Sequence, residues 1–320
     1  MSDIVGLLLP FFGLIFVGFF VARISRQPVE ALGWMNTFVI YVALPALFFQ
    51  LLAKTPFEDL TEWGFIFGSV FSTAIVFSLM FAASAALSGG EIAESTIKGL
   101  AAAYGNIGYM GPGLAVLAFG EQAAVPVALI FCFENIMHFT IAPMMMALAG
   151  GDKRPLPQLA AGIAGRIALH PFIIATAAGV AAAYFGLRPP LPLERLLAYL
   201  SGAAAPCALF AMGVTLALRP LKRVPHEIVP ITLLKLIVHP LLCYAMLGWV
   251  GHYSEVWVFS AVLLAALPTA TNVFVIAQQY GVWVQRASAS ILITTCASAV
   301  TVTGLLYLIR SGALPADLFP

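Results

Sequence analysis

The chain alternates between long apolar stretches and short polar breaks along almost its whole length. A helix needs about 20 mainly apolar residues to cross a bilayer. Ten stretches meet this requirement, and they predict transmembrane helices near residues 4–22, 32–52, 64–88, 97–119, 124–149, 163–185, 196–218, 229–250, 256–280 and 287–310. Residues 1–320 are therefore predicted to form a single all-α membrane domain.

The Lys and Arg residues between these stretches are distributed unevenly over alternate loops. One set of loops carries Arg23, Arg26, Lys98, Lys153, Arg154, Arg166, Arg219, Lys222, Arg223 and Arg286. The other set carries Lys54, Arg188, Arg195 and Arg310. Because positive residues are retained on the cytoplasmic side, both termini are predicted to face away from the cytoplasm.

The sequence also repeats itself weakly at an offset of 161 residues. The matches are Pro10 and Phe11 with Pro171 and Phe172, Gly18 with Gly179, Pro45 with Pro206, Phe49 with Phe210, and Gly120 with Gly281. They predict two repeats, residues 1–150 and 163–310. Because each holds five helices, the repeats must have opposite orientations, a plan typical of secondary transporters with a binding site at the midplane.

The composition excludes a water-soluble fold, since 62% of the residues are hydrophobic and only 9% are charged. A net charge of +1 provides no basic surface for nucleic acid. The four cysteines lie singly in apolar stretches and indicate neither a disulfide framework nor a zinc site. No metalloprotease motif, phosphate-binding loop or intramembrane aspartate pair is present, so the sequence predicts neither an enzyme nor a cofactor or metal site.

Two of the predicted helices contain runs that disfavour a continuous helix. Gly105–Gly113 holds four glycines and a proline, and Leu267–Asn272 holds Pro268 at nearly the equivalent depth of the second repeat. Proline removes an amide donor, and glycine tolerates unwound backbone. Both helices are predicted to break near their middles. Unwound backbone at membrane depth is tolerated only where protein or a water-filled cavity satisfies its polar groups, so a polar site is expected there.

The candidate substrate-binding residues come from these two runs. They are Asn106, Gly108, Gly111, Pro112, Gly113, Pro268, Thr269, Thr271 and Asn272. Half-helices beginning near Gly113 and Asn272 would present amide groups with partial positive charge, which suit a carboxylate. The alternative is that glycine and proline only kink the helices for packing.

A second candidate group consists of polar residues inside apolar segments, and a role in coupling is one interpretation. It comprises Glu134, Asn135, His138, Lys235 and His239. Glu134 is the one carboxylate well inside a predicted helix, which makes it a functional candidate. Glu134 and His138, like Lys235 and His239, are four residues apart and share a helix face. The alternatives are a structural ion pair, or a Lys235 that reaches toward the membrane interface.

Three segments together resemble the auxin efflux carrier family, which includes plant auxin carriers and bacterial malate and malonate carriers. They are Asn36–Ala53, with Phe38-Val-Ile-Tyr-Val-Ala-Leu-Pro45, Asn106–Pro112, and Leu267–Asn272. The resemblance covers essentially the full chain. It implies a fold similar to that of bile-acid and sodium/proton carriers, in a bacterial inner (plasma) membrane, with the helices of segments 97–119 and 256–280 crossing at the cargo site.

The same resemblance implies that the helices form two functional groups, a scaffold and a transport domain. The first, second, sixth and seventh would form a scaffold, and the third to fifth and eighth to tenth a mobile transport domain, in a homodimer. Asn106 and the amides after Pro112 would contact a carboxylate, with Pro268 and Asn272 as partners. The plant carriers have a proline next to their asparagine, whereas Ile107 follows Asn106 here.

The resulting hypothesis is a secondary active transporter that moves a small mono- or dicarboxylate by elevator-type alternating access. The partners expected are the organic anion and membrane lipid, and both a proton and a sodium ion are open as the coupling ion. The alternative is an anion channel, or a membrane receptor that senses a ligand in the same cavity. An unrecognised membrane enzyme is a third, weaker alternative.

Overall fold

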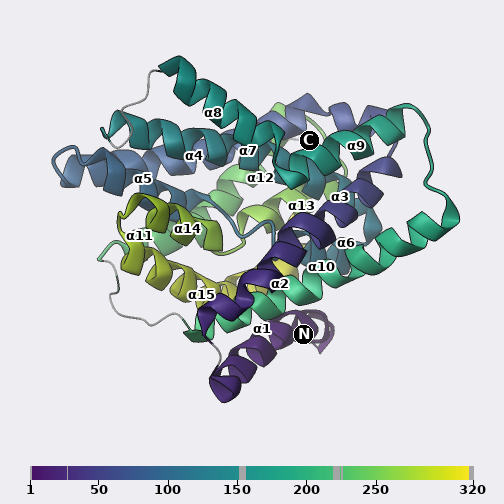
Figure 1. Cartoon of the computed structure of the whole chain (residues 1–320), viewed down its shortest axis with the longest axis horizontal. Helices are drawn as coiled ribbons and strands as arrows, with labels where there is room; N and C mark the ends of the chain where they lie inside the picture. The colour runs from purple at the N-terminus through teal and green to yellow at the C-terminus, as the bar shows by residue number, and fades with distance from the viewer. Residues whose placement is uncertain (1, 27, 151–155, 219–223, 225, 317–320) are drawn as a thin grey trace. The chain divides into compact units, whose positions relative to one another are not determined.

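The structure, a computed structural model, describes residues 2–26, 28–150, 156–218, 224 and 226–316. The described residues form α-helices with short 3-10 and π turns and include no β-strand, as Figure 1 shows. The predicted all-α class is confirmed. By internal contacts the chain divides into unit 1 (Met1–Trp63, Gly108–Cys132 and Ala168–Pro220) and unit 2 (Gly64–Ile107, Phe133–Ile167 and Leu221–Pro320).

Unit 1 contains the helices of the first two predicted segments and parts of the later ones. Its elements are α1 (Ser2–Ser25), η1 (Val29–Leu32), α2 (Gly33–Phe38), η2 (Val39–Ala43), α3 (Leu44–Ala53), η3 (Phe57–Thr61), α6 (Gly111–Phe119), η4 (Glu121–Ala123), α9 (Pro171–Tyr184) and α10 (Leu191–Leu218). The helix α7 (Ala124–Leu148) begins in unit 1 and continues in unit 2 from Phe133.

Unit 2 contains most of the remaining helices. They are α4 (Trp63–Leu87), α5 (Ile92–Ala103), α8 (Leu156–Ala168), α11 (Ile228–Leu233), η5 (Leu234–Val238), α12 (His239–Val250), α13 (Glu255–Ala265), α14 (Thr271–Tyr280) and α15 (Val284–Arg310). A division by contacts does not describe motion. The predicted scaffold and transport groups therefore stay a prediction.

Six helical stretches in the described part of the chain are long and apolar enough to cross a membrane. They are Gly33–Ala53, Trp63–Leu87, Glu121–Leu148, Leu191–Leu218, Ile228–Val250 and Val284–Arg310. Shorter apolar helices are Phe12–Ser25, Pro171–Tyr184 and Glu255–Ala265. A helical membrane architecture agrees with these lengths, while the number of ten crossings and the inverted repeat stay predictions.

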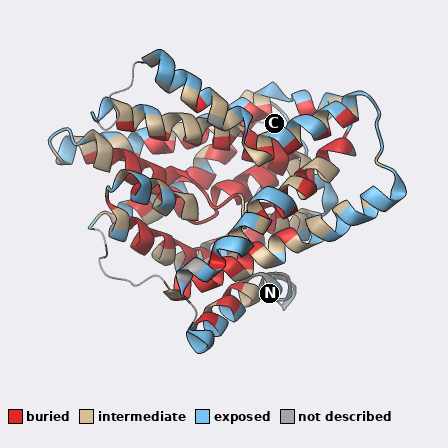
Figure 2. Cartoon of the chain, viewed as in Figure 1, coloured by how far each residue is buried: buried red, intermediate tan, exposed pale blue. Residues whose placement is uncertain are grey.

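Several helix faces that Figure 2 colours as exposed carry large apolar side chains. Phe16 and Phe20 on α1 and Trp34 on α2 are examples, with Trp34 85% exposed. Extended exposed apolar surface is costly in water and typical of a membrane or protein interface. The burial pattern is therefore the one expected of helices that contact lipid.

Three of the predicted segments are interrupted rather than continuous. The segment near 97–119 is divided into α5 and α6, and the segment near 256–280 into α13 and α14, at the two runs that predicted a break. The segment near 163–185, predicted as one continuous helix, is also divided, between α8 and α9. Pro171 begins α9 and has no amide hydrogen to continue the helix from α8, which accounts for this third break.

The helices of unit 1 pack through glycines that let backbones touch. A Cβ atom at Gly18 on α1 would overlap the carbonyl oxygen of Phe210 on α10, and one at Gly213 would overlap the carbonyl oxygen of Ile15. A Cβ at Gly179 on α9 would lie 2.9 Å from the Leu52 Cβ and 3.2 Å from the Phe49 carbonyl oxygen. Small residues at helix contacts are the usual means of close packing in membranes.

Two π turns each end two residues before a proline. The turn η2 precedes Pro45, and the turn η5 precedes Pro240. Since proline cannot donate to the carbonyl four residues earlier, the helix adjusts its hydrogen-bond register at these points. In unit 2 this adjustment involves the turn that carries Lys235.

Candidate functional site

Two unwound segments pair with each other inside unit 2. The segment after α5 and the segment between α13 and α14 run antiparallel, with an isolated bridge between Gly105 and Thr269. The Asn106 amide donates to the Pro268 carbonyl at 2.7 Å, and the Ala270 amide donates to the Tyr104 carbonyl at 2.8 Å. The freed backbone groups thus satisfy one another, as polar backbone within a membrane requires.

Thr269 secures this pairing from the side. Its hydroxyl donates to the Ala101 carbonyl of α5 at 2.7 Å, and its amide donates to the Thr294 hydroxyl of α15 at 3.2 Å. Gly105 allows the close approach, because a Cβ there would lie 3.2 Å from the Lys235 Nζ and 3.3 Å from the Leu264 carbonyl oxygen. A larger residue at 105 would force these neighbours to move.

The predicted binding residues of unit 2 lie along this pairing. Asn106 and Thr269 are buried, and Pro268 lies within the unwound segment. Thr271 and Asn272 form the first turn of α14 and are half-buried. The amide end of this ten-residue helix carries partial positive charge beside two polar side chains, which suits a negatively charged group.

The other predicted binding residues belong to unit 1. Gly111 and Pro112 are the first two residues of α6, and Gly113 follows them. At Gly108, a Cβ would lie 3.0 Å from the ring of Phe131, which stacks on Phe48 at 4.7 Å between ring centroids. The close approach of an aromatic ring explains the glycine at 108, and a role of these four residues in binding stays a prediction.

A buried polar chain connects α4, α7 and the segment η5–α12 in unit 2. The Thr73 hydroxyl donates to the Glu134 Oε1 at 2.7 Å and lies 2.9 Å from the His239 Nε2. The His239 Nδ1 lies 2.8 Å from the Lys235 Nζ, which donates to the Ala265 carbonyl at 2.6 Å. The chain thus ends at the last residue of α13, directly before the unwound segment.

A second buried group surrounds the Tyr104 ring. The Tyr104 hydroxyl donates to the Asn135 Oδ1 at 2.7 Å and accepts a hydrogen bond from the Asn272 Nδ2 at 2.9 Å. The His138 ring stacks on the Tyr104 ring at 3.8 Å, and its Nδ1 lies 2.7 Å from the Glu134 carbonyl oxygen. Asn272 of the predicted binding set and Asn135 of the predicted coupling set therefore share one hydroxyl.

The five predicted coupling residues thus lie in unit 2. Lys235 and His239 contact each other directly, as their shared helix face predicts, whereas His138 contacts Glu134 only at its backbone carbonyl. The side chain of Glu134 is linked through Thr73 to His239 rather than to the ring of His138. The alternative in which Lys235 reaches the membrane interface is wrong, because Lys235 is fully buried. Its ammonium is held by the carbonyl end of α13 and by His239.

Sequence reasoning missed Thr73, Tyr104 and Thr294. Thr73 lies one helical turn from Ser69 and next to Ser72, a group of hydroxyls inside a very apolar helix that could have drawn attention to this face. Tyr104 directly precedes the Gly105-Asn106 break. Thr294 has no comparable local signal, because hydroxyls are frequent along α15.

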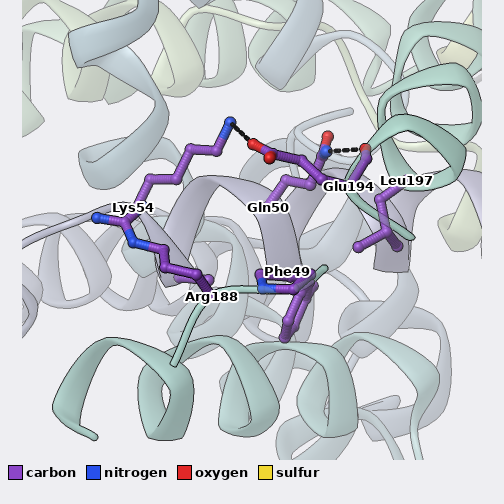
Figure 3. Close-up of a pocket in the computed structure, with 8 residues that line it drawn as sticks. Phe49, Gln50, Lys54, Arg188, Glu194 and Leu197 are labelled. Atoms are coloured by element: carbon purple, nitrogen blue, oxygen red, sulfur yellow. Dashed lines mark hydrogen bonds and ion pairs between the residues drawn. The ribbon is translucent and has the colours of Figure 1, made fainter. Parts of the chain in front are cut away.

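An open depression in unit 1 has a different character. It is lined by Phe49, Gln50, Ala53, Lys54, Arg188, Pro189, Glu194 and Leu197. Figure 3 shows the Lys54 ammonium directed at the Glu194 carboxylate, 3.1 Å away, with both side chains substantially exposed. None of the predicted site residues lines it, and its exposed ion pair is typical of a polar helix end.

Long apolar helices, two paired unwound segments and a buried polar chain together define a helical membrane protein with an internal polar site. The family to which the chain belongs agrees with this class of protein. A model of the membrane transport protein family matches residues 3–159 and 163–306, so the chain belongs to that family, and the resemblance to auxin efflux carriers is confirmed.

The chain is similar to several curated proteins over nearly its whole length. It is 65% identical, over all of both chains, to a protein of Rhizobium meliloti (strain 1021) named "Putative malonate transporter". It is 24% identical to the "Uncharacterized transporter YfdV" of Escherichia coli (strain K12), over 96% of this chain and 98% of the other. An "Uncharacterized transporter" of Methanothermobacter thermautotrophicus is also 24% identical, over 90% and 92%. These relatives are named as transporters, not as enzymes.

Proposed function

We propose that the protein is a secondary active transporter of a small organic anion, and that a dicarboxylate of the size of malonate is its cargo. The observation that carries the proposal is the pairing of the unwound segments of unit 2, which leaves the amide end of α14 beside Thr271 and Asn272. The name of the 65% identical relative supports malonate as the first acid to test.

The proposed binding mode is electrostatic and directional. A carboxylate at the start of α14 would accept hydrogen bonds from backbone amides of its first turn and from the Asn272 and Thr271 side chains. Charge-assisted hydrogen bonds of this kind are about twice as strong as neutral ones. The link from Asn272 through Tyr104 to Asn135 would hold the asparagine amide in place.

We also propose that two inverted five-helix repeats underlie the fold and that the cargo moves by elevator-type alternating access. A reciprocal contact in unit 1 supports the repeat. Gly18 packs on Phe210, and Gly179 packs on Phe49, so an offset of 161 residues exchanges the two contacts. A pseudo-twofold relation between α1–α3 and α9–α10 would produce this exchange.

Uptake by proteoliposomes tests the proposed function. Purified protein should take up radiolabelled malonate with saturation, and unlabelled malonate on the opposite side should accelerate exchange. Conductance without saturation would indicate a channel, and binding without flux would indicate a receptor. Either result would reject the carrier.

The binding residues can be tested with a screen of organic acids by thermal shift. We expect stabilisation by the cargo in the wild type and its loss in Asn272→Asp, since the new carboxylate repels an anion. Gln278→Glu is the matched control, because it adds the same charge to the exposed far end of α14. Equal stabilisation of all three proteins would reject the site. Asn106→Ala tests the remaining part of the predicted set in the same way.

Membrane topology and assembly are proposed on separate grounds, the distribution of Lys and Arg and the family resemblance. Both termini are expected on the non-cytoplasmic side of a bacterial inner membrane, and the protein is expected to be a homodimer. Reporter fusions at either end, active only outside the cytoplasm, test the first expectation. Mass determination in detergent tests the second.

A further inference from the structure

The buried polar chain of unit 2 contains a complete set of donors and acceptors for one arrangement of its protons. Thr73 has a single hydroxyl proton, and it is used toward the Glu134 Oε1. His239 must then donate from its Nε2 to the Thr73 oxygen, which leaves its Nδ1 free to accept from the Lys235 ammonium. Between Lys235 and Glu134, each hydrogen bond of the chain is thus donated in the direction of Glu134.

We propose that Glu134 is the proton-binding site of the carrier, held in a hydrogen-bonded chain with Thr73, His239 and Lys235, and that protonation of Glu134 couples transport to a proton gradient. This inference rests on the proposed transport function. It selects the proton over sodium as the coupling ion, and it assigns Thr73 to the chain as a hydroxyl link between a carboxylate and an imidazole.

Few other titratable groups face this chain. Among the described residues, they are His138 on α7, Cys243 on α12 and the Tyr104 hydroxyl directly after α5. The chain-facing side chains of α4 are the hydroxyls of Ser69, Ser72 and Thr73, and α13 contributes the Ala265 carbonyl. Glu134 is therefore the one acid and Lys235 the one strong base of the cluster.

The position of Lys235 favours a proton over sodium as the coupling ion. Its ammonium donates to the Ala265 carbonyl, at the helix end where the backbone dipole is negative. The same ammonium would lie 3.2 Å from a Cβ at Gly105, so it stands directly behind the unwound segment. A fixed cation thus already occupies the carbonyl end of α13, and the Pro268 and Tyr104 carbonyls accept from amides of the opposite segment.

The charge of the cluster connects this chain to the cargo. With Glu134 ionised and Lys235 protonated, the cluster is neutral. One proton taken from water by the Glu134 carboxylate leaves a net charge of +1 beside the unwound segments, which favours one additional negative charge on the bound anion. Linkage is reciprocal, so anion binding must favour uptake of that proton by the same factor.

The proton step is balanced without any further reactant. A hydronium ion gives its proton to Glu134 and becomes water, and the protonated carboxyl donates to the Thr73 oxygen. The Thr73 hydroxyl can turn to the Ser69 carbonyl, 3.4 Å away. Return of the proton to water on release of the anion restores the first arrangement.

The experiment compares two measurements on the same proteoliposomes. Malonate exchange at equal pH on both sides reports transport itself, and malonate accumulation driven by a pH gradient reports coupling. For the wild type we expect up to about tenfold accumulation per pH unit at one proton per malonate, and no accumulation driven by a sodium gradient. Absence of exchange would reject the proposed transport function, whereas exchange without gradient-driven accumulation would reject only the coupling.

The variants locate the coupling. Glu134→Gln should still exchange malonate, but its exchange should no longer depend on pH and its gradient-driven accumulation should disappear. Glu194→Gln in unit 1 removes an exposed carboxylate and should behave as the wild type. Full accumulation by Glu134→Gln would overturn the proposal.

Thr73→Val keeps the proposal testable if Glu134→Gln does not fold. Valine has nearly the shape of threonine and leaves both charges in place, but it removes the hydroxyl link. We expect gradient-driven accumulation to fall at least tenfold relative to exchange. Accumulation equal to that of the wild type would overturn the role of the chain.

Discussion

Unit 1 and unit 2 of this protein differ in how they use their interiors. The described helices of unit 1 pack through glycines and aromatic rings, and their ion pair, Lys54–Glu194, is exposed. Unit 2 buries a carboxylate, two ammonium groups and two imidazoles. Buried polar groups are costly unless they are paired. The comparison therefore indicates that the interior of unit 1 serves close packing, whereas the interior of unit 2 holds a hydrogen-bonded polar network.

The largest effect is expected from removing the Lys235 cation of unit 2. Lys235→Met leaves the Glu134 carboxylate buried without its counter-charge, and we expect a loss of about 3–5 kcal/mol of stability. Thermal unfolding in detergent measures this. The double variant Lys235→Met with Glu134→Gln should recover a large part of the loss, and a double variant as unstable as the single one would show that the two charges are not coupled.

The close helix packing of unit 1 can be tested by adding a single methyl group at a glycine. Gly18→Ala places a Cβ against the Phe210 carbonyl oxygen, and overpacking of this kind costs about 1–3 kcal/mol. Gly13→Ala on the same helix meets nothing within 4 Å and is the matched control, for which we expect no loss. Equal unfolding temperatures of the two variants would contradict the backbone contact.

Tyr104→Phe tests the hydroxyl of the second buried group, because it removes this hydroxyl and keeps the ring. The variant keeps the stacking on His138 but leaves the Asn135 and Asn272 amides without their shared partner, at an expected cost of about 1–3 kcal/mol. Malonate affinity should also fall, since Asn272 loses its support. Unchanged malonate affinity in an isothermal titration would show that Tyr104 does not support the binding site.

The smallest effect is expected at a polar helix end of unit 2. The Lys98 ammonium contacts Glu227 at 2.5 Å and Glu94 at 2.8 Å. Burial alone would raise the pKa of the Glu227 carboxyl, but its hydrogen bond with Lys98 and the attraction of that charge hold this pKa below the ordinary value of 4.5.

A lowered pKa in the folded state makes this contribution depend on pH in a defined direction. It is fully present above the unfolded-state pKa and is lost as the pH falls through the folded-state pKa. Glu227→Gln should therefore destabilise the protein by about 1 kcal/mol at pH 7. The difference from the wild type should shrink below about pH 4.5. A difference that grows in acid would contradict the ion pair.

Much of the fold could be predicted because apolar length and proline position act locally. The breaks at Gly105–Gly113 and Leu267–Asn272 followed from the lack of an amide in proline and the freedom of glycine. The antiparallel pairing of Asn106 with Pro268 could not be read from the sequence, since it joins residues far apart in the chain. The same holds for Thr73, whose partners Glu134 and His239 lie on two other helices.

Isothermal titration of malonate into purified protein tests the central claim, that an organic anion binds at the first turn of α14, most directly. The account predicts saturable binding by the wild type and by Gln278→Glu, and at least tenfold weaker binding by Asn272→Asp. Undiminished binding by Asn272→Asp would contradict it.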